Sequence, residues 1–413
     1  MKPWILVRSE HALMRLGGRT LLGRLLEILR RENRPAEGVI CPEPLVAQVK
    51  DELASAISPC RLLLPSEFLP LAKESAEANL LLLDAGVLFD QRLIKSALDW
   101  NEASVLVDSQ PPDEQKACAQ AKGHSFAGIV ALPARRISEL LDTGSSIFNL
   151  TEKLDRVDNI AICDIESLPP YHPPIRRALR PFWVPIEDSG DIRHARWTLA
   201  RSMSKGHMEW LVYLLNRPVE TFLSYFLAET RITPNQITIV CNLVAFGACA
   251  LFALGHLWIG VLLSLFVGIL DGLDGRQARI QIKTSKLGEI EHFFDKIYEI
   301  TWMAALGWHF SAGLTNMPEI WAAVGWIAAH IIDGGAYYFY RAKSGMMIDE
   351  ATKTDAIIRF FAGCRNTSMA ILLIGLIVGR PLSFFWFIVW LNVATAVIHW
   401  CRTAILLSRR RWK

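Results

Sequence analysis

The sequence lacks several features that would place it in a familiar class. Its eight cysteines contain no Cys-x-x-Cys pair, which argues against a zinc ribbon or a thioredoxin-type site. A formal net charge of +3 is too small to indicate nucleic-acid binding by itself, so we expect no nucleic-acid partner. The first apolar stretch is short and is interrupted by Arg8 and Glu10, which is not typical of a signal peptide.

Charge is also missing from one long segment of the chain. Charged residues make up 21% of the 413 residues, yet none lies between Gln236 and Leu270. Tryptophan follows the same division, because most of the 14 tryptophans come after residue 190. We therefore predict a soluble domain over residues 1–185, a linker with an interfacial amphipathic helix over 186–230, and a transmembrane domain over 231–413.

The soluble part alternates short apolar runs with helical patterns. Strands are predicted at 4–7, 38–41, 61–64, 80–84, 104–108, 126–132 and 160–163, and helices at 20–31, 44–57 and 91–100. Strands that alternate with helices favour a mostly parallel sheet of the α/β class.

The membrane part contains six candidate spans, which predict an all-α bundle of six transmembrane helices. They are residues 236–254, 256–270, 288–309, 318–340, 367–379 and 382–407. Basic residues gather in the segments 276–286, 341–365 and 409–413, whereas the other connections hold one basic residue between them. The positive-inside rule then predicts a multi-pass protein of the cytoplasmic membrane with both termini on the cytoplasmic side.

Four acidic residues lie close to the predicted cytoplasmic ends of the second and third spans. Asp271 and Asp274 are three residues apart, and Glu291 and Asp295 are four apart, so each pair shares one face of a helix. Carboxylates at the ends of apolar helices are costly unless a cation lies between them. Oxygen ligands suit Mg²⁺ or Mn²⁺, which predicts a metal site at the membrane surface.

Small and basic residues accompany the first acidic pair. Gly275 and Ala278 leave room for a ligand beside the helix, and Arg279 can contact a phosphate. Together with the carboxylates, these residues predict metal-assisted phosphoryl transfer on the cytoplasmic side.

This pattern resembles the signature of the CDP-alcohol phosphotransferase family. That signature has Asp, two residues, Asp-Gly, two residues, Ala-Arg, about eight residues, Gly, and then two further Asp at steps of four. The matching residues here are Asp271, Asp274, Gly275, Ala278, Arg279 and Gly288. The TPNQIT stretch at 233–238 and the six spans are also similar to the family, and the resemblance covers residues 231–410.

The sequence departs from the family signature after Gly288. The positions four and eight residues on are His292 and Lys296, while Glu291 and Asp295 each come one residue early. By resemblance, Asp271, Asp274, Glu291 and Asp295 hold two Mg²⁺ or Mn²⁺ ions, and Asp295 also acts as the general base.

The resemblance also implies the remaining ligand contacts. The donor is a CDP-alcohol, and Asn235 and Thr238 join Gly275, Ala278, Arg279 and Gly288 in binding it. Arg365, at the start of the fifth span, is expected to bind a phosphate of the acceptor, whose hydroxyl attacks the donor with release of CMP. Members of the family are commonly homodimers in a lipid bilayer.

The soluble part resembles a nucleotidyltransferase domain. The resemblance rests on residues 17–31, 81–94 and 126–132. Active members have a glycine-rich loop after the first strand and a metal-binding Asp near the position of Asp84. Here the loop reads RSEHALMR without a glycine, so we expect this Rossmann-like domain to be inactive. The arrangement resembles bifunctional enzymes that make CDP-inositol and transfer its phosphoinositol group.

Two other functions remain open at this point. A polyprenyl transferase that binds diphosphate through aspartates would release pyrophosphate instead of CMP. A non-catalytic membrane scaffold would bind neither CDP nor Mg²⁺. The identity of the CDP-alcohol and its acceptor also stays open between phospholipid and inositol-phosphate synthesis.

Overall fold

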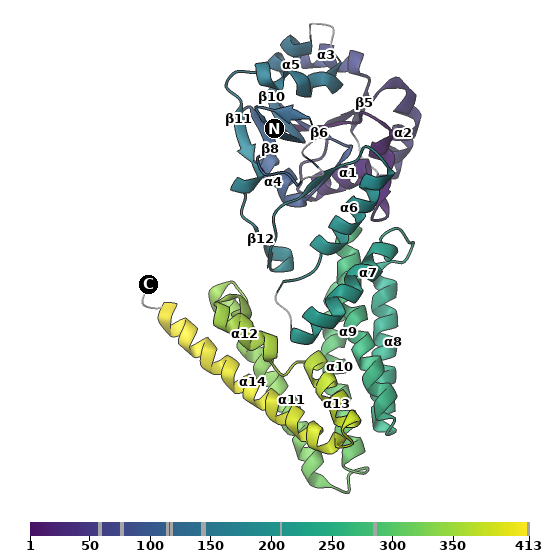
Figure 1. The fold of residues 1–413 in the computed structure, drawn as a ribbon, viewed down its shortest axis with the longest axis vertical. Helices are drawn as coiled ribbons and strands as arrows, with labels where there is room; N and C mark the ends of the chain where they lie inside the picture. The colour runs from purple at the N-terminus through teal and green to yellow at the C-terminus, as the bar shows by residue number, and fades with distance from the viewer. Residues whose placement is uncertain are drawn as a thin grey trace. The chain divides into compact units, whose positions relative to one another are not determined.

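The computed structural model describes residues 1–56, 60–74, 78–112, 115, 119–141, 146–206, 209–283 and 287–410 (Figure 1). The chain divides into two compact units. The N-terminal unit contains residues 1–172, 178–202 and 228–230, and the helical unit contains residues 173–177, 203–227 and 231–413. The predicted linker is divided between them, because α6 (Ser189–Ser202) belongs to the first unit and α7 (Arg217–Leu227) to the second.

The N-terminal unit is built on the mostly parallel sheet that the sequence predicts. In spatial order its strands are β11 (Ala161–Asp164), β8 (Ser104–Asp108), β10 (His124–Pro133), β6 (Asn79–Asp84), β1 (Lys2–Leu6), β4 (Gly38–Ile40) and β5 (Arg61–Leu63). Only β10 runs antiparallel to its neighbours in this described order, and the short β9 (Gln120–Ala121) pairs with it. The carboxyl ends of β1, β6, β8 and β11 therefore lie at one edge of the sheet.

Helices lie on both faces of this sheet in Figure 1. They are α1 (Leu21–Arg31), α2 (Val46–Ser55), α3 (Pro65–Glu74), α4 (Gln91–Leu98) and α5 (Ala134–Leu141). On the face covered by α3 and α5, Leu80 and Leu82 of β6 share a buried cluster with Phe68 and Ile137. Alternate residues of a strand point to one face, so the apolar runs in the sequence supply a core on each side.

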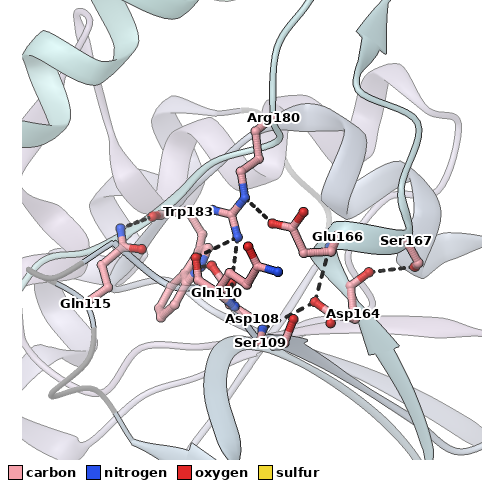
Figure 2. A network of polar contacts seen from close by, with 9 residues as sticks. All are labelled: Asp108, Ser109, Gln110, Gln115, Asp164, Glu166, Ser167, Arg180 and Trp183. Carbon is pink, nitrogen blue, oxygen red and sulfur yellow. Dashed lines mark hydrogen bonds and ion pairs between the residues drawn. The ribbon is translucent and has the colours of Figure 1, made fainter.

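A late segment of the chain is attached to this unit through β7 (Val87–Phe89) and the end of β8. Strand β14 (Trp183–Pro185) pairs with β7. Asp108, fully buried at the end of β8, receives hydrogen bonds from Trp183 Nε1 at 2.9 Å and from Arg180 Nη2 at 2.6 Å (Figure 2). Arg180 also pairs with Glu166, so one buried carboxylate anchors this segment to the sheet.

In the described part of the helical unit, seven α-helices follow α7. They are α8 (Pro234–Ala253), α9 (Leu257–Ile280), α10 (Leu287–Phe310), α11 (Met317–Ser344), α12 (Lys353–Phe361), α13 (Arg365–Ile377) and α14 (Pro381–Arg410). Helix α8 begins with a capping box between Thr233 and Gln236 and has Pro234 at its first position. Trp302 and Trp326 meet edge to face in the buried core, with ring centroids 5.0 Å apart.

Each of the six predicted spans falls mainly within one of these helices, and only residues 254, 256, 378 and 379 lie outside them. Among the described residues α8, α9 and residues 381–408 of α14 meet the requirements of length and hydropathy. A fourth span exists if α12 and α13, which meet at a bend of 41°, count as one. Helices α10 and α11 have the length of a span but carry more polar residues and do not meet these requirements. The all-α class of this part is confirmed, and the number of six spans stays a prediction.

We expect Asp108→Ala to loosen the attachment of β14. The change removes the acceptor for the buried Trp183 indole and for Arg180, and an unsatisfied buried donor costs about 1–3 kcal/mol. Hydrogen exchange of the β14 amides should therefore speed up by roughly tenfold or more. The control Asp99→Ala changes an exposed residue and should leave this exchange unaltered; equal protection in both variants would contradict the anchoring role.

Candidate functional site

The helical unit contains a cavity of about 310 Å³ that is lined by acidic and basic side chains in equal number. The acids are Glu209, Glu220, Asp271, Asp274 and Asp295, and the bases are Arg176, Lys205, Arg276, Arg279 and Arg359. Three of the four predicted carboxylates thus come together in one cavity. Helix α9 supplies Asp271 and Asp274, and α10 supplies Asp295.

Asp274 lines the cavity, and its carboxylate accepts hydrogen bonds from Thr238 and Gly275. It is 3% exposed, and the hydroxyl of Thr238 donates to its Oδ2 at 2.8 Å. The backbone N–H of Gly275 donates to Oδ1. Thr238, which the resemblance assigns to the nucleotide, therefore contacts the carboxylate that it would assist. It reaches Asp274 from the first turns of α8, which explains why the TPNQIT stretch and the Asp pair occur together.

Asp271 is held from another helix. Arg365 Nη2, at the first position of α13, lies 2.8 Å from Asp271 Oδ2. The side chain of Asp271 is 33% exposed and lines the cavity, whereas Arg365 is buried and is not part of the described lining. The expected contact of Arg365 with an acceptor phosphate is not tested by this arrangement and stays a prediction.

A buried ion pair connects α7 to α9 close to the two aspartates. Glu220 of α7 and Arg276 of α9 are 3% and 1% exposed and lie 2.8 Å apart. Thr221 accepts a further hydrogen bond from Arg276. A Cβ atom at Gly272 would lie only 2.2 Å from Glu220 Oε1, so a side chain at this position would displace the Glu220 carboxylate.

The sequence patterns did not reveal Glu220 and Arg276 as site residues. Glu220 lies in the segment that the sequence predicts to be an interfacial amphipathic helix, and a charged residue in an apolar stretch is typical of such a helix. The available signal was the acidic residue itself, since a buried glutamate in an apolar helix requires a cation.

The basic side of the cavity comes from segments that lie far apart in the sequence. Arg359 of α12 donates to Glu209 at 3.2 Å, and Arg176 pairs with Asp349. Arg279 Nε donates to the carbonyl of Met203 at 3.0 Å. Lys205, which is exposed, completes this group. Of these four cations only Arg279 was predicted, because the others precede or follow the motif and share no spacing with it.

Other predicted ligands lie outside the described side chains or outside the cavity lining. The side chains of Gly288 and Glu291 lie outside the described residues. Ala278 and Asn235 are described but are not among the residues that line the cavity.

The donor set is chemically suited to a divalent cation, because carboxylate oxygens are the ligands that Mg²⁺ and Mn²⁺ prefer. Among the described residues no three acidic, histidine or cysteine side chains are close enough to hold one ion together. Asp271, Asp274 and Asp295 face one cavity, and Glu291 would have to complete such a set.

In the N-terminal unit, the candidate carboxylate of a nucleotide site is already paired. Asp84 ends β6, and Arg8, which follows β1, places Nε 2.8 Å from its Oδ2. Gly86 N–H donates to Oδ1 at 2.9 Å. Burial raises the pKa of Asp84 above its ordinary value, and the charge of Arg8 opposes this shift. The guanidinium thus lies at the carboxylate that the resemblance assigns to a metal.

Comparison with known proteins supports the interpretation of the helical unit. Residues 231–398 match the CDP-alcohol phosphatidyltransferase family. Three curated relatives are each described as "Bifunctional IPC transferase and DIPP synthase". The protein of Aquifex aeolicus is 27% identical over 48% of this chain and 45% of its own length. The chain thus spans about half the length of this relative.

The other two relatives come from archaea. The Thermococcus kodakarensis protein is 26% identical over 76% of this chain and 77% of its own length. The Archaeoglobus fulgidus protein is 28% identical over 57% of this chain and 48% of its own length.

Solved structures similar to each part of the chain were also found. The phosphatidylinositol phosphate synthase of Mycobacterium tuberculosis with CDP-DAG bound is 20% identical, with a TM-score of 0.37, over 45% of this chain and 94% of that chain. The same synthase has been solved with manganese and citrate. The inositol-1-phosphate CTP transferase of T. maritima is 13% identical, with a TM-score of 0.34, over 46% of this chain and 91% of that chain.

We expect Gly272→Ala to destabilise the helical unit, because the new methyl group would displace the Glu220 carboxylate from its buried pair with Arg276. Overpacking of this kind costs about 1–3 kcal/mol. The matched control is Gly247→Ala in α8, where a Cβ would meet nothing within 4 Å, and where alanine should be neutral or slightly stabilising. Thermal unfolding of the full chain in detergent measures both; equal midpoints would refute the close packing.

Proposed function

We propose that the helical unit, whose residues 231–398 match the CDP-alcohol phosphatidyltransferase family, transfers a substituted phosphate group from a CDP-alcohol to an acceptor hydroxyl. The acceptor oxygen forms a bond to the phosphorus that carries the alcohol, the bond from that phosphorus to the CMP oxygen breaks, and CMP leaves. The observation that carries this proposal is the shared cavity of Asp271, Asp274 and Asp295.

Each carboxylate has a proposed role in this reaction. Asp271, Asp274 and Glu291 would hold two Mg²⁺ or Mn²⁺ ions, with Asp295 sharing them. Such ions, when bound, supply neutralisation of the negative charge on the diphosphate. Asp295 would accept the proton from the attacking hydroxyl as general base. Thr238 and the Gly275 N–H would keep the Asp274 carboxylate oriented, because each donates a hydrogen bond to a different one of its two oxygens.

The charges of the cavity favour anionic substrates. Its acidic and basic side chains balance one another, so bound divalent cations would leave a net positive site. A diphosphate donor would use part of this charge. Its proposed contacts are Arg279, Asn235 and the small residues Gly275, Ala278 and Gly288. Arg176, Lys205 and Arg359 would remain for an acceptor that carries its own phosphate. An acceptor of this kind is consistent with either an inositol-phosphate or a phospholipid product.

The remaining assignments follow from the same reasoning. We propose that the protein lies in the cytoplasmic membrane with the cavity and both termini on the cytoplasmic side, that it is a homodimer, and that it binds no nucleic acid. The N-terminal unit is proposed to be inactive as a nucleotidyltransferase, because Arg8 holds Asp84 and the preceding loop lacks glycine. The proposed division of the chain remains 1–185, 186–230 and 231–413.

A screen of CMP release by the purified protein tests this function. CDP-diacylglycerol, CDP-inositol and smaller CDP-alcohols are each combined with Mg²⁺ or Mn²⁺ and with hydroxyl acceptors that either carry or lack a phosphate. Release of pyrophosphate from a polyprenyl diphosphate would support the alternative transferase. Failure to bind CDP or a divalent cation would support a scaffold.

We expect Asp295→Asn to lower CMP release by about a hundredfold or more, because the amide cannot accept the proton of the acceptor hydroxyl. Asp271→Asn should have at least as large an effect. The control Asp333→Asn changes a carboxylate of α11 that pairs with His399 outside the cavity. Steady-state CMP release is measured at saturating metal, and wild-type turnover in either site variant would show that the site is assigned incorrectly.

We expect Lys205→Gln to weaken binding of the acceptor and to leave binding of the donor unchanged. Loss of one cation at the exposed side of the cavity should raise KM for a phosphate-bearing acceptor by roughly three- to tenfold, with KM for the CDP-alcohol unchanged. Lys353→Gln, which removes a lysine outside the cavity lining, is the control. An equal rise in both KM values, or none, would argue against an acceptor phosphate at this position.

A further inference from the structure

Arg365 is a buried cation that touches the site through one of its acids. It opens α13 and is 9% exposed, and its side chain is not among those that line the cavity. Burying a guanidinium without a partner is expensive, so the contacts that it makes define what it can do.

Two contacts fix the guanidinium in place. Nη2 lies 2.8 Å from Asp271 Oδ2. The guanidinium carbon lies 5.4 Å from the ring centroid of Tyr298 on α10, as in a cation–π contact. Tyr298 is itself 1% exposed and its hydroxyl donates to Ser264 of α9 at 3.1 Å. The arginine is thereby held between the helix that carries Asp295 and the helix that carries Asp271.

This geometry gives the two oxygens of Asp271 different surroundings. A carboxylate can accept hydrogen bonds at both oxygens, and here Oδ2 is occupied by the buried arginine while the side chain still reaches the cavity. A metal ligand whose second oxygen is held by a neighbouring donor is fixed in orientation, and loss of such a neighbour commonly costs 10–100-fold in metal affinity.

We propose that Arg365 is a positioning residue that acts through Asp271: it holds Oδ2 so that the other oxygen is presented to a divalent cation. This inference rests on the proposed metal-dependent function. It differs from an acceptor contact, because the arginine then needs no access to the substrate and its loss is felt before any substrate binds.

Binding of Mn²⁺ in the absence of substrates tests the inference. The full-length protein in detergent is titrated with Mn²⁺, and the free ion is measured by electron paramagnetic resonance. Arg365→Gln should weaken Mn²⁺ binding by roughly 10–100-fold. Arg365→Lys keeps the charge but loses the planar fork, so its affinity should lie between those of Arg365→Gln and the wild type.

The matched control is Arg402→Gln, which removes an arginine that pairs with Asp355 at 2.6 Å, away from the cavity lining. It should leave Mn²⁺ affinity unchanged, and thermal unfolding identifies any variant that has lost its fold. If Arg365→Gln does not fold, the Arg365→Lys comparison decides the question, and wild-type affinity in that variant overturns the inference.

The outcomes separate this inference from the proposed function. A wild-type protein that binds no Mn²⁺ contradicts the metal-dependent function itself. A wild-type protein that binds Mn²⁺, with Arg365→Gln binding it equally or more tightly, contradicts only the positioning role. Unchanged Mn²⁺ affinity together with a raised KM for the acceptor would instead assign Arg365 to the acceptor phosphate.

Discussion

Negative charge at the ends of apolar helices is the constraint on which the helical unit depends. A carboxylate removed from water must be paired, and the penalty grows with burial. Asp271, Asp274 and Glu220 are therefore each held by a donor from another element: Arg365 of α13, Thr238 of α8 and Arg276 of α9. These pairs connect α7, α8, α9 and α13 around one cavity, so the packing of the helices and the geometry of the acids have the same origin.

The N-terminal unit also pairs its buried carboxylates, and it does so with arginines. At the carboxyl edge of its sheet, Asp84 is paired with Arg8, and Asp108 is held by Arg180 and Trp183. Arginines of the unit itself thus meet both carboxylates at this edge. In the helical unit the acids keep one side toward a cavity that also contains cations. The first arrangement favours stability, whereas the second leaves carboxylates such as Asp271 partly exposed to the cavity.

The sequence predicts much of the fold because its signals are local. The apolar runs locate β1, β4, β6, β8 and β11, and the amphipathic patterns locate α1 and α4. The antiparallel course of β10 was not predicted, because orientation in a sheet depends on neighbours distant in the chain. The number of spans is harder to predict, because residues such as Asp295 and Glu299 make α10 less apolar than α8 or α9.

The candidate site divides in the same way. Asp271, Asp274 and Arg279 were recognisable from spacing within one motif. The pairs Glu220–Arg276 and Asp271–Arg365 join residues 56 and 94 positions apart, and no sequence period links such partners. Gly275 was predicted as a place for a ligand to approach. Gly272, which directly follows Asp271, was not singled out, although it is the position where the Glu220 side chain of α7 comes closest to α9.

The bend between α12 and α13 has an electrostatic consequence of its own. At the break, Gly363 N–H donates to Thr395 and its carbonyl accepts from Asn392, so α14 satisfies the backbone that the interruption exposes. A second helix can then begin at Arg365. The amino end of α13 carries a partial positive charge from its aligned peptide dipoles. The interruption therefore places a fixed partial positive charge at the helix turn from which Asn366 lines the cavity, and neither pH nor substitution of a titratable residue can remove it.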